Sequence, residues 1–297
     1  MTPGELRLRL PSIGVAARDW GPRDGAPVLA LHGWLDNAAS FDGLAPLLDG
    51  VRVVALDLPG HGRSDRLPSG CGMHFADWVA IVLAGADALE WPRFAVIGHS
   101  MGAGIASLLP GVAPERIERV VLLEGIGPLS EPAERAPATL AEALAQEARL
   151  AESAPRLFPS FEAAVAARRR DSDLNPEAAS RLVERGSEQV EGGVRFRFDP
   201  RLRTRSRVRF TEEQVLAFLR AITCPALAVR ASQGWPFPKE LVAARAAAIP
   251  SLQVVEVEGG HHVHLTHPER VATAVREFLA ADGRGARDEG FAPPSRR

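Results

Sequence analysis

The run FAVIGHSMGAG at residues 94–104 constrains the fold more than any other part of the chain. Four apolar residues lead to a bend in which a serine has one glycine two positions before it and another two positions after it. A G-x-S-x-G sequence between a strand and a helix places the serine hydroxyl above the sheet, and its glycines allow close packing in the bend. We therefore expect Gly98 and Gly102 to be structural and Ser100 to be the reactive residue.

Short apolar runs bounded by Gly, Pro and Asp recur along the chain and predict buried strands, with helical patterns between them. Near-continuous apolar strands that alternate with helices indicate an α/β fold, in which helices cover both faces of a mostly parallel sheet. Residues 5–10 alternate Leu and Arg, which suits an antiparallel edge strand instead. The expected strands are 28–31, 51–56, 94–97, 120–123, 226–229 and 254–257, and the expected helices are 75–89, 103–109 and 271–281.

The alternation stops after residue 127 and resumes near residue 223, and the stretch between has a different composition. It is rich in Ala, Glu and Arg, with helical patterns over 138–152, 162–170 and 176–185. Because structureless loops of this length are uncommon, we expect an inserted helical lid. The predicted organisation is a first part of the α/β core at 1–127, the lid at 128–222, a second part of the core at 223–282, and a disordered tail at 283–297.

Composition excludes several classes of protein. A formal net charge of −2 argues against a nucleic-acid partner, which calls for a basic surplus. Only two cysteines are present, Cys71 and Cys224, which fits a reducing compartment. The N-terminus has no signal-peptide pattern and the chain has no run of 18 uncharged apolar residues. We therefore expect a cytoplasmic protein without a membrane partner, and nothing in the sequence predicts its oligomeric state.

A second motif, LHGW at residues 31–34, ends an earlier predicted strand. A site for acyl transfer needs two backbone N–H donors that point at the developing oxyanion. The residue after the reactive serine, Met101, is placed to give one, and Trp34 the other. The alternative is a plain turn that ends the strand. Structural roles around the site are expected for His32, Gly33 and His99.

A third motif, GGHHVHLTHPE at 259–269, holds four of the eight histidines. A base that activates serine near neutral pH is best supplied by histidine. His261 is preferred because it directly follows two glycines and leads the loop, and His262 is the alternative base. His264 and His267 are expected to be packing or surface residues. No Cys or Asp joins the cluster, and histidines this close on one loop do not easily converge on a metal, so we expect no metal and no cofactor.

These motifs resemble the α/β-hydrolase superfamily, in the order in which the family has them. The stretches that carry the resemblance are HGW at 32–34, DLPGHGRSD at 57–65, GHSMG at 98–102 and GGHHVHLTHPE at 259–269. More narrowly, residues 31–41, 184–201 and 230–237 look like the serine hydrolase-like proteins. The resemblance implies the α/β-hydrolase fold, Ser100 as nucleophile, His261 as base, and oxyanion donors at Trp34 and Met101.

One expected member of the triad is missing from its usual place. In the family the acid usually follows the penultimate strand, but residues 226–237 hold no carboxylate and the next is Glu240. The strand after the bend helix ends in Glu124, beside the nucleophile strand and at the functional edge of a parallel sheet. Some α/β-hydrolases use an acid there. We expect Glu124 to orient His261, with Glu240, or no acid at all, as the alternatives.

A serine nucleophile excludes the dehalogenase and epoxide-hydrolase chemistry that, in similar families, uses Asp at this position. The simplest reaction is hydrolysis of a small-molecule carboxylic ester through an acyl-serine intermediate. Carbon–carbon bond hydrolysis or acyl transfer on the same triad is one alternative, and an inactive hydrolase-fold ligand-binding protein is another. The Arg-rich stretch 195–209 is interpreted as a solvated face that pairs with the Glu-rich lid helices, rather than as a selector of carboxylate-bearing substrates.

Overall fold

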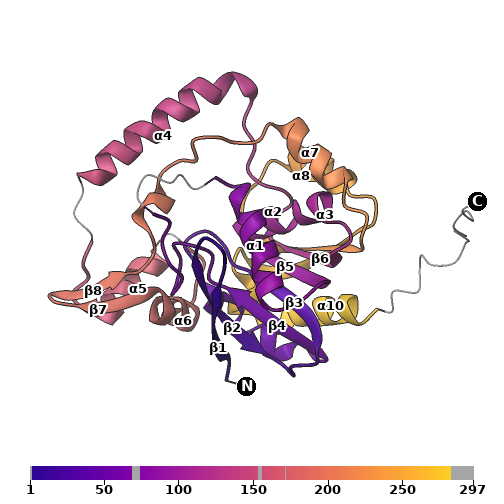
Figure 1. The fold of residues 1–297 in the computed structure, drawn as a ribbon, viewed down its shortest axis with the longest axis horizontal. Helices are drawn as coiled ribbons and strands as arrows, with labels where there is room; N and C mark the ends of the chain where they lie inside the picture. Colours follow the sequence, from indigo (N-terminus) through magenta and orange to yellow (C-terminus); the bar gives the residue numbers. More distant parts are fainter. Residues whose placement is uncertain (1, 69–73, 153–155, 171, 282–297) are drawn as a thin grey trace, which may run out of the picture.

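A computed structural model describes residues 2–68, 74–152, 156–170 and 172–281, and Figure 1 shows its fold. These residues form an eight-stranded sheet of order β1-β2-β4-β3-β5-β6-β9-β10. The β1–β2 and β2–β4 pairs are antiparallel and the remaining pairs are parallel. The strands are β1 Gly4–Arg9, β2 Gly14–Trp20, β3 Ala26–Leu31, β4 Val51–Leu56, β5 Phe94–His99, β6 Ile117–Leu123, β9 Ala226–Gln233 and β10 Leu252–Gly260.

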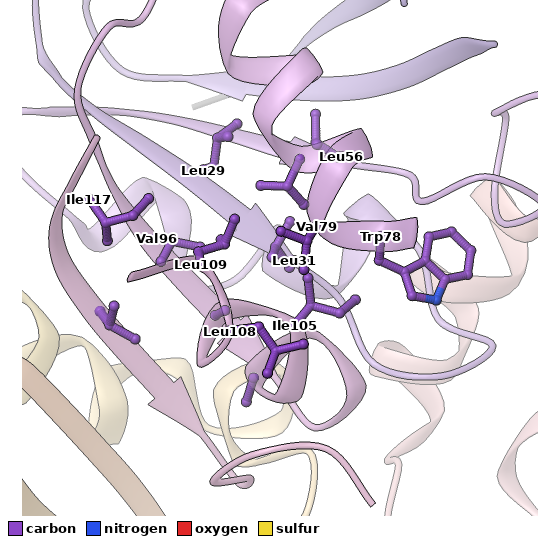
Figure 2. Close-up of a cluster of buried hydrophobic side chains, with 14 of the residues drawn as sticks. Leu29, Leu31, Leu56, Trp78, Val79, Val96, Ile105, Leu108, Leu109 and Ile117 are labelled. Atoms are coloured by element: carbon purple, nitrogen blue, oxygen red, sulfur yellow. The ribbon is translucent and has the colours of Figure 1, made fainter. Parts of the chain in front are cut away.

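The central strands are apolar on both faces because helices cover both. In β3, Leu29 and Leu31 belong to one buried cluster, and Val28 and Ala30, which point the other way, belong to a second. The first cluster lies under α1 Asp77–Ala88, α2 Met101–Ala106, α3 Leu109–Val112 and α7 Glu212–Arg220, and Figure 2 shows part of it. The second lies under the 3-10 helix η1 Ala38–Phe41 and the helix α10 Pro268–Ala280. The predicted α/β fold and all six predicted core strands are confirmed.

The N-terminal edge strand is also confirmed, since β1 pairs only with β2 and antiparallel to it. Strand β2 was not expected from the sequence, because Arg18 and Asp19 interrupt its apolar run. Both charges are paired in the structure: Arg18 contacts Asp42, and Asp19 accepts from Arg52 at 2.7 Å. Pairing of this kind is what allows charged residues within a partly buried strand.

The predicted helix at 103–109 is wrong as one element. Helix α2 ends at Ala106 and α3 begins at Leu109, because Pro110 in the first turn of α3 has no N–H with which to continue the preceding helix. Helix α7 was missed although Thr211 and Gln214 form a capping box at its start. The remaining helical elements outside the insertion are the 3-10 turn η2 Ala45–Leu47, α8 Lys239–Ala247 and α9 Val263–Thr266.

The inserted segment contains the three predicted helices, seen as α4 Ala136–Ala151, α5 Phe161–Arg169 and α6 Pro176–Gly186. Helix α7 lies at the C-terminal end of the same segment. The segment also contains a hairpin that was not predicted, β7 Ser187–Val190 and β8 Gly193–Phe196, as well as the 3-10 turns η3 Ala133–Arg135 and η4 Pro200–Arg203. In Figure 1, α4 lies apart from the sheet, whereas α5, α6 and the hairpin gather beside β1 and β2. A lid role for the segment stays a prediction, and the expected tail at 283–297 lies outside the described residues.

Candidate active site

Ser100 lies in a tight turn between the end of β5 and the start of α2. Its φ of 52° and ψ of −111° are in a region that side-chain-bearing residues rarely adopt, and its N–H is held by the Leu123 carbonyl at 2.9 Å. A Cβ at Gly98 would lie 2.2 Å from the Gly102 carbonyl oxygen, and one at Gly102 would lie 2.1 Å from the Leu31 carbonyl oxygen. Both clashes are with main-chain atoms, so the turn has no room for a side chain at either glycine.

His261 follows β10 and faces Ser100. Its Nε2 lies 2.9 Å from Ser100 Oγ, and its Nδ1 lies 3.2 Å from Glu124 Oε2. With Nδ1–H donating to the carboxylate, Nε2 is left to accept from the serine hydroxyl. The structure thus brings together three predicted residues from the ends of β5, β6 and β10, with the imidazole in the middle.

Glu124 extends its carboxylate from the end of β6 to the end of β9. It follows β6 with a φ of 55°, and its buried carboxylate reaches the turn after β9. Oε1 accepts from the N–H of Ala231, near the end of β9, at 2.5 Å, and Oε2 accepts from the N–H of Trp235, in the turn, at 3.3 Å. A Cβ at Gly234 would lie 2.0 Å from Oε2, so a side chain there would displace the carboxylate from this position. Glu240 is exposed in the first turn of α8.

The loop after β3 carries Trp34, one of the two expected oxyanion donors. The close approach of Gly102 to the Leu31 carbonyl sets the start of α2 against this loop. Among the described residues, no acceptor binds the backbone N–H of Trp34 or of Met101, so both N–H groups are available to a ligand. The indole of Trp34 is half exposed and donates to the Leu202 carbonyl at 2.8 Å, which ties the loop to the inserted segment.

His32 and Gly33 lie in this loop and make close contacts within it. The buried His32 ring donates from Nδ1 to the Gly33 carbonyl at 2.7 Å and accepts at Nε2 from the Leu58 N–H at 3.0 Å. Burial lowers the pKa of His32 to about 4, so the ring is neutral and can keep both bonds. Gly33 is required because a Cβ there would lie 2.9 Å from Nδ1 of His99.

His99 supports the loop that carries the base. Its Nε2–H donates to the His261 carbonyl at 2.8 Å, and the side chain is fully buried. Burial, followed by the neighbouring His264, holds the pKa of His99 well below its ordinary value. His264 is buried as well and its Nε2 lies 2.7 Å from Ser40 Oγ, so it packs beneath the site.

His262, the alternative base, is directed away from the nucleophile. It hydrogen-bonds Asp173 and lies 3.6 Å from Asp36. Asp36 is also paired with Arg168 of α5. Sequence analysis missed Asp36, Asp173 and Arg168, because only the folded chain shows which loops meet.

The Arg-rich stretch is paired as predicted at two of its arginines. Arg207 binds Glu147 of α4 at 2.6 Å, and Arg205 contacts Glu131 and, at 3.3 Å, Glu142 of α4. In the part of the chain that the structure describes, no group of three His, Cys, Asp or Glu side chains is arranged to hold a metal ion. None of the helices within these same residues combines the length and apolar character that crossing a membrane requires.

Comparison with known proteins identifies relatives along nearly the whole chain. The family described as the alpha/beta hydrolase fold matches residues 26–268. A serine hydrolase-like protein of Dictyostelium discoideum is 34% identical over 95% of this chain and 82% of its own. The crystal structure of a hypothetical protein from Pseudomonas aeruginosa PAO1 is 42% identical, with a TM-score of 0.87 over 93% of this chain and 98% of that one. A thioesterase domain from the curacin biosynthetic pathway is 27% identical, with a TM-score of 0.79 over 93% of this chain and 99% of its own.

Proposed function

This chain belongs to the α/β-hydrolase fold family and, within it, resembles the serine hydrolase-like proteins, and on that premise we propose that it hydrolyses a small-molecule carboxylic ester. Ser100 is the nucleophile, His261 the base and Glu124 the acid. The observation that carries the proposal is the continuous path of contacts from Ser100 Oγ through the imidazole to the carboxylate, at 2.9 and 3.2 Å.

Acylation starts at Ser100. His261 Nε2 takes the hydroxyl proton as Oγ attacks the ester carbonyl carbon, and the carbonyl oxygen becomes an oxyanion. The free N–H groups of Trp34 and Met101 hold this oxyanion. When the tetrahedral intermediate collapses, the imidazolium returns the proton to the leaving alcohol oxygen, and an acyl-serine remains.

Deacylation repeats the same steps with water. His261 takes a proton from the water, whose oxygen attacks the acyl carbon, and then returns it to Ser100 Oγ as the acid leaves. Glu124 keeps its charge throughout: it fixes Nδ1–H and stabilises the imidazolium that forms in each half. The two main-chain N–H groups from Ala231 and Trp235 hold its carboxylate in place for that task.

Labelling with a fluorophosphonate probe tests the proposal. We expect the wild-type protein and the control Ser251→Ala, which changes an exposed serine, to react with the probe, and Ser100→Ala to remain unlabelled. Turnover of a chain-length series of p-nitrophenyl esters is expected to fall by about 10⁴-fold or more in Ser100→Ala. An unlabelled wild-type protein, or equal labelling of Ser100→Ala, contradicts the proposal and favours a hydrolase-fold ligand-binding protein.

A further inference from the structure

We infer that Asp173, which the inserted segment contributes, is a positioning residue for the base His261 and acts through His262. The inference rests on the proposed function, since it concerns how the base of that reaction is held. The arrangement that carries it is a row of three side chains, Asp173, His262 and Asp36, called the carboxylate–histidine bridge below.

Asp173 holds the residues on both sides of the base. It lies between α5 and α6, and its Oδ2 accepts from the His262 N–H at 2.8 Å while its Oδ1 accepts from His262 Nδ1–H at 2.5 Å. On the other side of the base, a Cβ at Gly260 would lie 2.3 Å from Asp173 Oδ2. The Asp173 carboxylate therefore packs against Gly260 and accepts hydrogen bonds from His262. These contacts hold the main chain on both sides of His261.

The far end of the bridge reaches the loop that carries an oxyanion donor. His262 Nε2 lies 3.6 Å from Oδ2 of Asp36, which is 2% exposed and comes two residues after Trp34. The N–H of Asp36 donates to the Gly33 carbonyl at 3.1 Å, so its position is tied to the same loop. A single imidazole thus spans the base loop, the oxyanion loop and the inserted segment.

The charges around the bridge balance only if His262 is an imidazolium. Two carboxylates, Asp36 and Asp173, face Arg168 and His262. An unpaired charge is costly at the buried Asp36, whereas the Asp173 side chain is 31% exposed. The other titratable groups that face the ring are the imidazoles of His99, His261 and His264, with centroids 5.2, 5.3 and 6.4 Å away. Burial keeps the pKa values of His99 and His264 low, so neither supplies the missing positive charge.

The pKa of His262 agrees with this geometry. Burial opposes the charged ring, but hydrogen bonds and charge interactions with Asp173 and Asp36 outweigh it and raise the pKa to about 9. Below that pH the imidazolium joins the three segments. Above it, a neutral ring faces two carboxylates, and the hold on the base loop weakens.

The test compares Asp173→Asn with Glu177→Gln, a matched control that removes an exposed carboxylate from α6 of the same segment. Initial rates of ester hydrolysis are measured from about pH 6 to pH 10, with kcat and KM separated. In Asp173→Asn we expect kcat to fall by about 10- to 100-fold with KM nearly unchanged, because a misplaced base slows chemistry rather than binding. We also expect the alkaline loss of activity to move down by about one pH unit, since His262 loses a charged partner.

A second variant, His262→Gln, covers the case in which Asp173→Asn does not fold. It is expected to have a low kcat that no longer declines near pH 9, because the titrating ring is gone. The inference is overturned if Asp173→Asn keeps the wild-type kcat and the wild-type alkaline loss of activity, or if His262→Gln keeps that alkaline loss. In either case, labelling of the wild type at Ser100 by the probe still supports the proposed function. A wild type that the probe does not label overturns the proposed function instead.

Discussion

Backbone strain is concentrated at the residues proposed to react. In the described part of the chain, four residues other than glycine have a positive φ, and three of them, Leu35, Ser100 and Glu124, lie in the loops that form the site. Such conformations cost about 1–3 kcal/mol each and persist where the surroundings fix them. Ser100 and Glu124 follow adjacent parallel strands, and the same backbone turn directs both side chains to one edge of the sheet.

Replacing Glu124 tests the acid directly. Glu124→Gln keeps the shape of the side chain but removes the charge that stabilises the imidazolium, so we expect kcat/KM for an ester to fall by about 10³- to 10⁴-fold. Glu240→Gln, in the exposed first turn of α8, is expected to stay within about twofold of wild type. Steady-state kinetics of the two variants decides the assignment, and the reverse ranking moves the acid to Glu240.

The sequence predicted part of this site because some residues interrupt a local pattern. Ser100 stands between two glycines, and Glu124 ends an otherwise apolar run, so both are visible without a structure. Asp173 and Asp36 do not interrupt a local pattern, because each is one of many polar residues in a loop. Their roles depend on contact between two loops that lie 137 residues apart in the sequence. The same reason hid Arg185, which reads as one more charge in a helix that is rich in charged residues.

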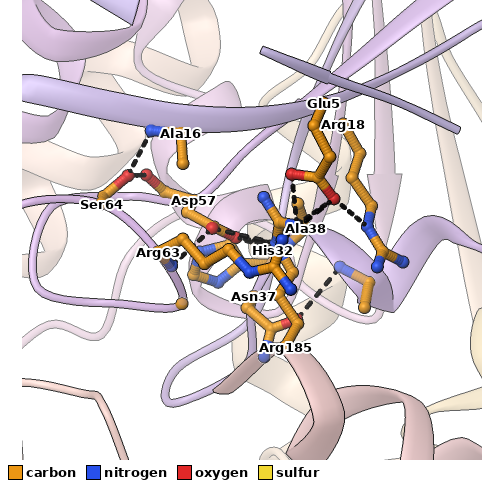
Figure 3. A network of polar contacts seen from close by, with 12 residues as sticks. Glu5, Ala16, Arg18, His32, Asn37, Ala38, Asp57, Arg63, Ser64 and Arg185 are labelled. Atoms are coloured by element: carbon orange, nitrogen blue, oxygen red, sulfur yellow. Dashed lines mark hydrogen bonds and ion pairs between the residues drawn. The ribbon is translucent and has the colours of Figure 1, made fainter. Parts of the chain in front are cut away.

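At the scale of whole elements, Arg185 attaches the inserted segment to the core. It lies in α6 with no exposed surface, and Figure 3 shows the network around it. Its Nε donates to both carboxylate oxygens of Asp57 at 3.0 Å, and its Nη1 donates to the two carboxylate oxygens of Glu5 at 2.7 and 2.9 Å. One side chain therefore joins α6 to the loop after β4 and to the edge strand β1.

Removing this arginine is expected to destabilise the protein strongly. Arg185→Leu leaves the fully buried Asp57 without its partner, and breaking a buried ion pair in this way costs about 3–5 kcal/mol. Arg207→Leu is the control, because its pair with Glu147 is in contact with solvent and contributes little to stability. Urea unfolding gives both values, and equal losses of stability in the two variants contradict the role assigned to Arg185.

Most elements of the core could be predicted because their patterns are local. Buried parallel strands such as β4 and β5 read as apolar runs, and the insertion reads as a change of composition. The hairpin of β7 and β8 was missed because its strands are only four residues long and largely polar, with Gly192 and Gly193 as the one turn signal. Helix α8 was missed because its apolar residues, mostly Ala, form no clear buried stripe, and Arg245 is its one buried residue.

At the scale of the whole molecule, histidines set the dependence of stability on pH. His32, His61, His99 and His264 are fully buried, and burial lowers the pKa of each, to about 4 for His32 and to about 3 for His61 and His264. Below the ordinary value of 6.5 the unfolded chain binds protons at these sites that the folded chain does not. These four histidines therefore lower the free energy of unfolding as pH falls from 6.5. His262 has a raised pKa, so its contribution is complete below 6.5 and is lost as pH rises through about 9.

The expected result is a stability maximum near neutral pH, with a steep acid side. Each neutral buried histidine adds about 1.4 kcal/mol per pH unit to the slope, so four together approach ~5 kcal/mol per unit around pH 5. Urea midpoints measured across the acid and alkaline ranges check this. A His262→Gln variant serves as the internal control, since it is expected to flatten the alkaline side only. A midpoint that does not change between neutral and mildly acidic pH contradicts the account.

The end of β9 and the turn after it hold the Glu124 carboxylate through two main-chain N–H groups, from Ala231 and Trp235. Such donors survive a change of side chain at their own positions, whereas Gly234 must stay as it is. A directed-evolution library that randomises Ser232, Gln233 and Trp235, the last of them beside the base, therefore alters the wall of the site and keeps the acid intact. In a hydrolase whose acid is itself a residue of this turn, the same library could replace the acid and abolish catalysis. On the proposed mechanism, side chains in this turn can therefore change while the main-chain donors to Glu124 stay in place.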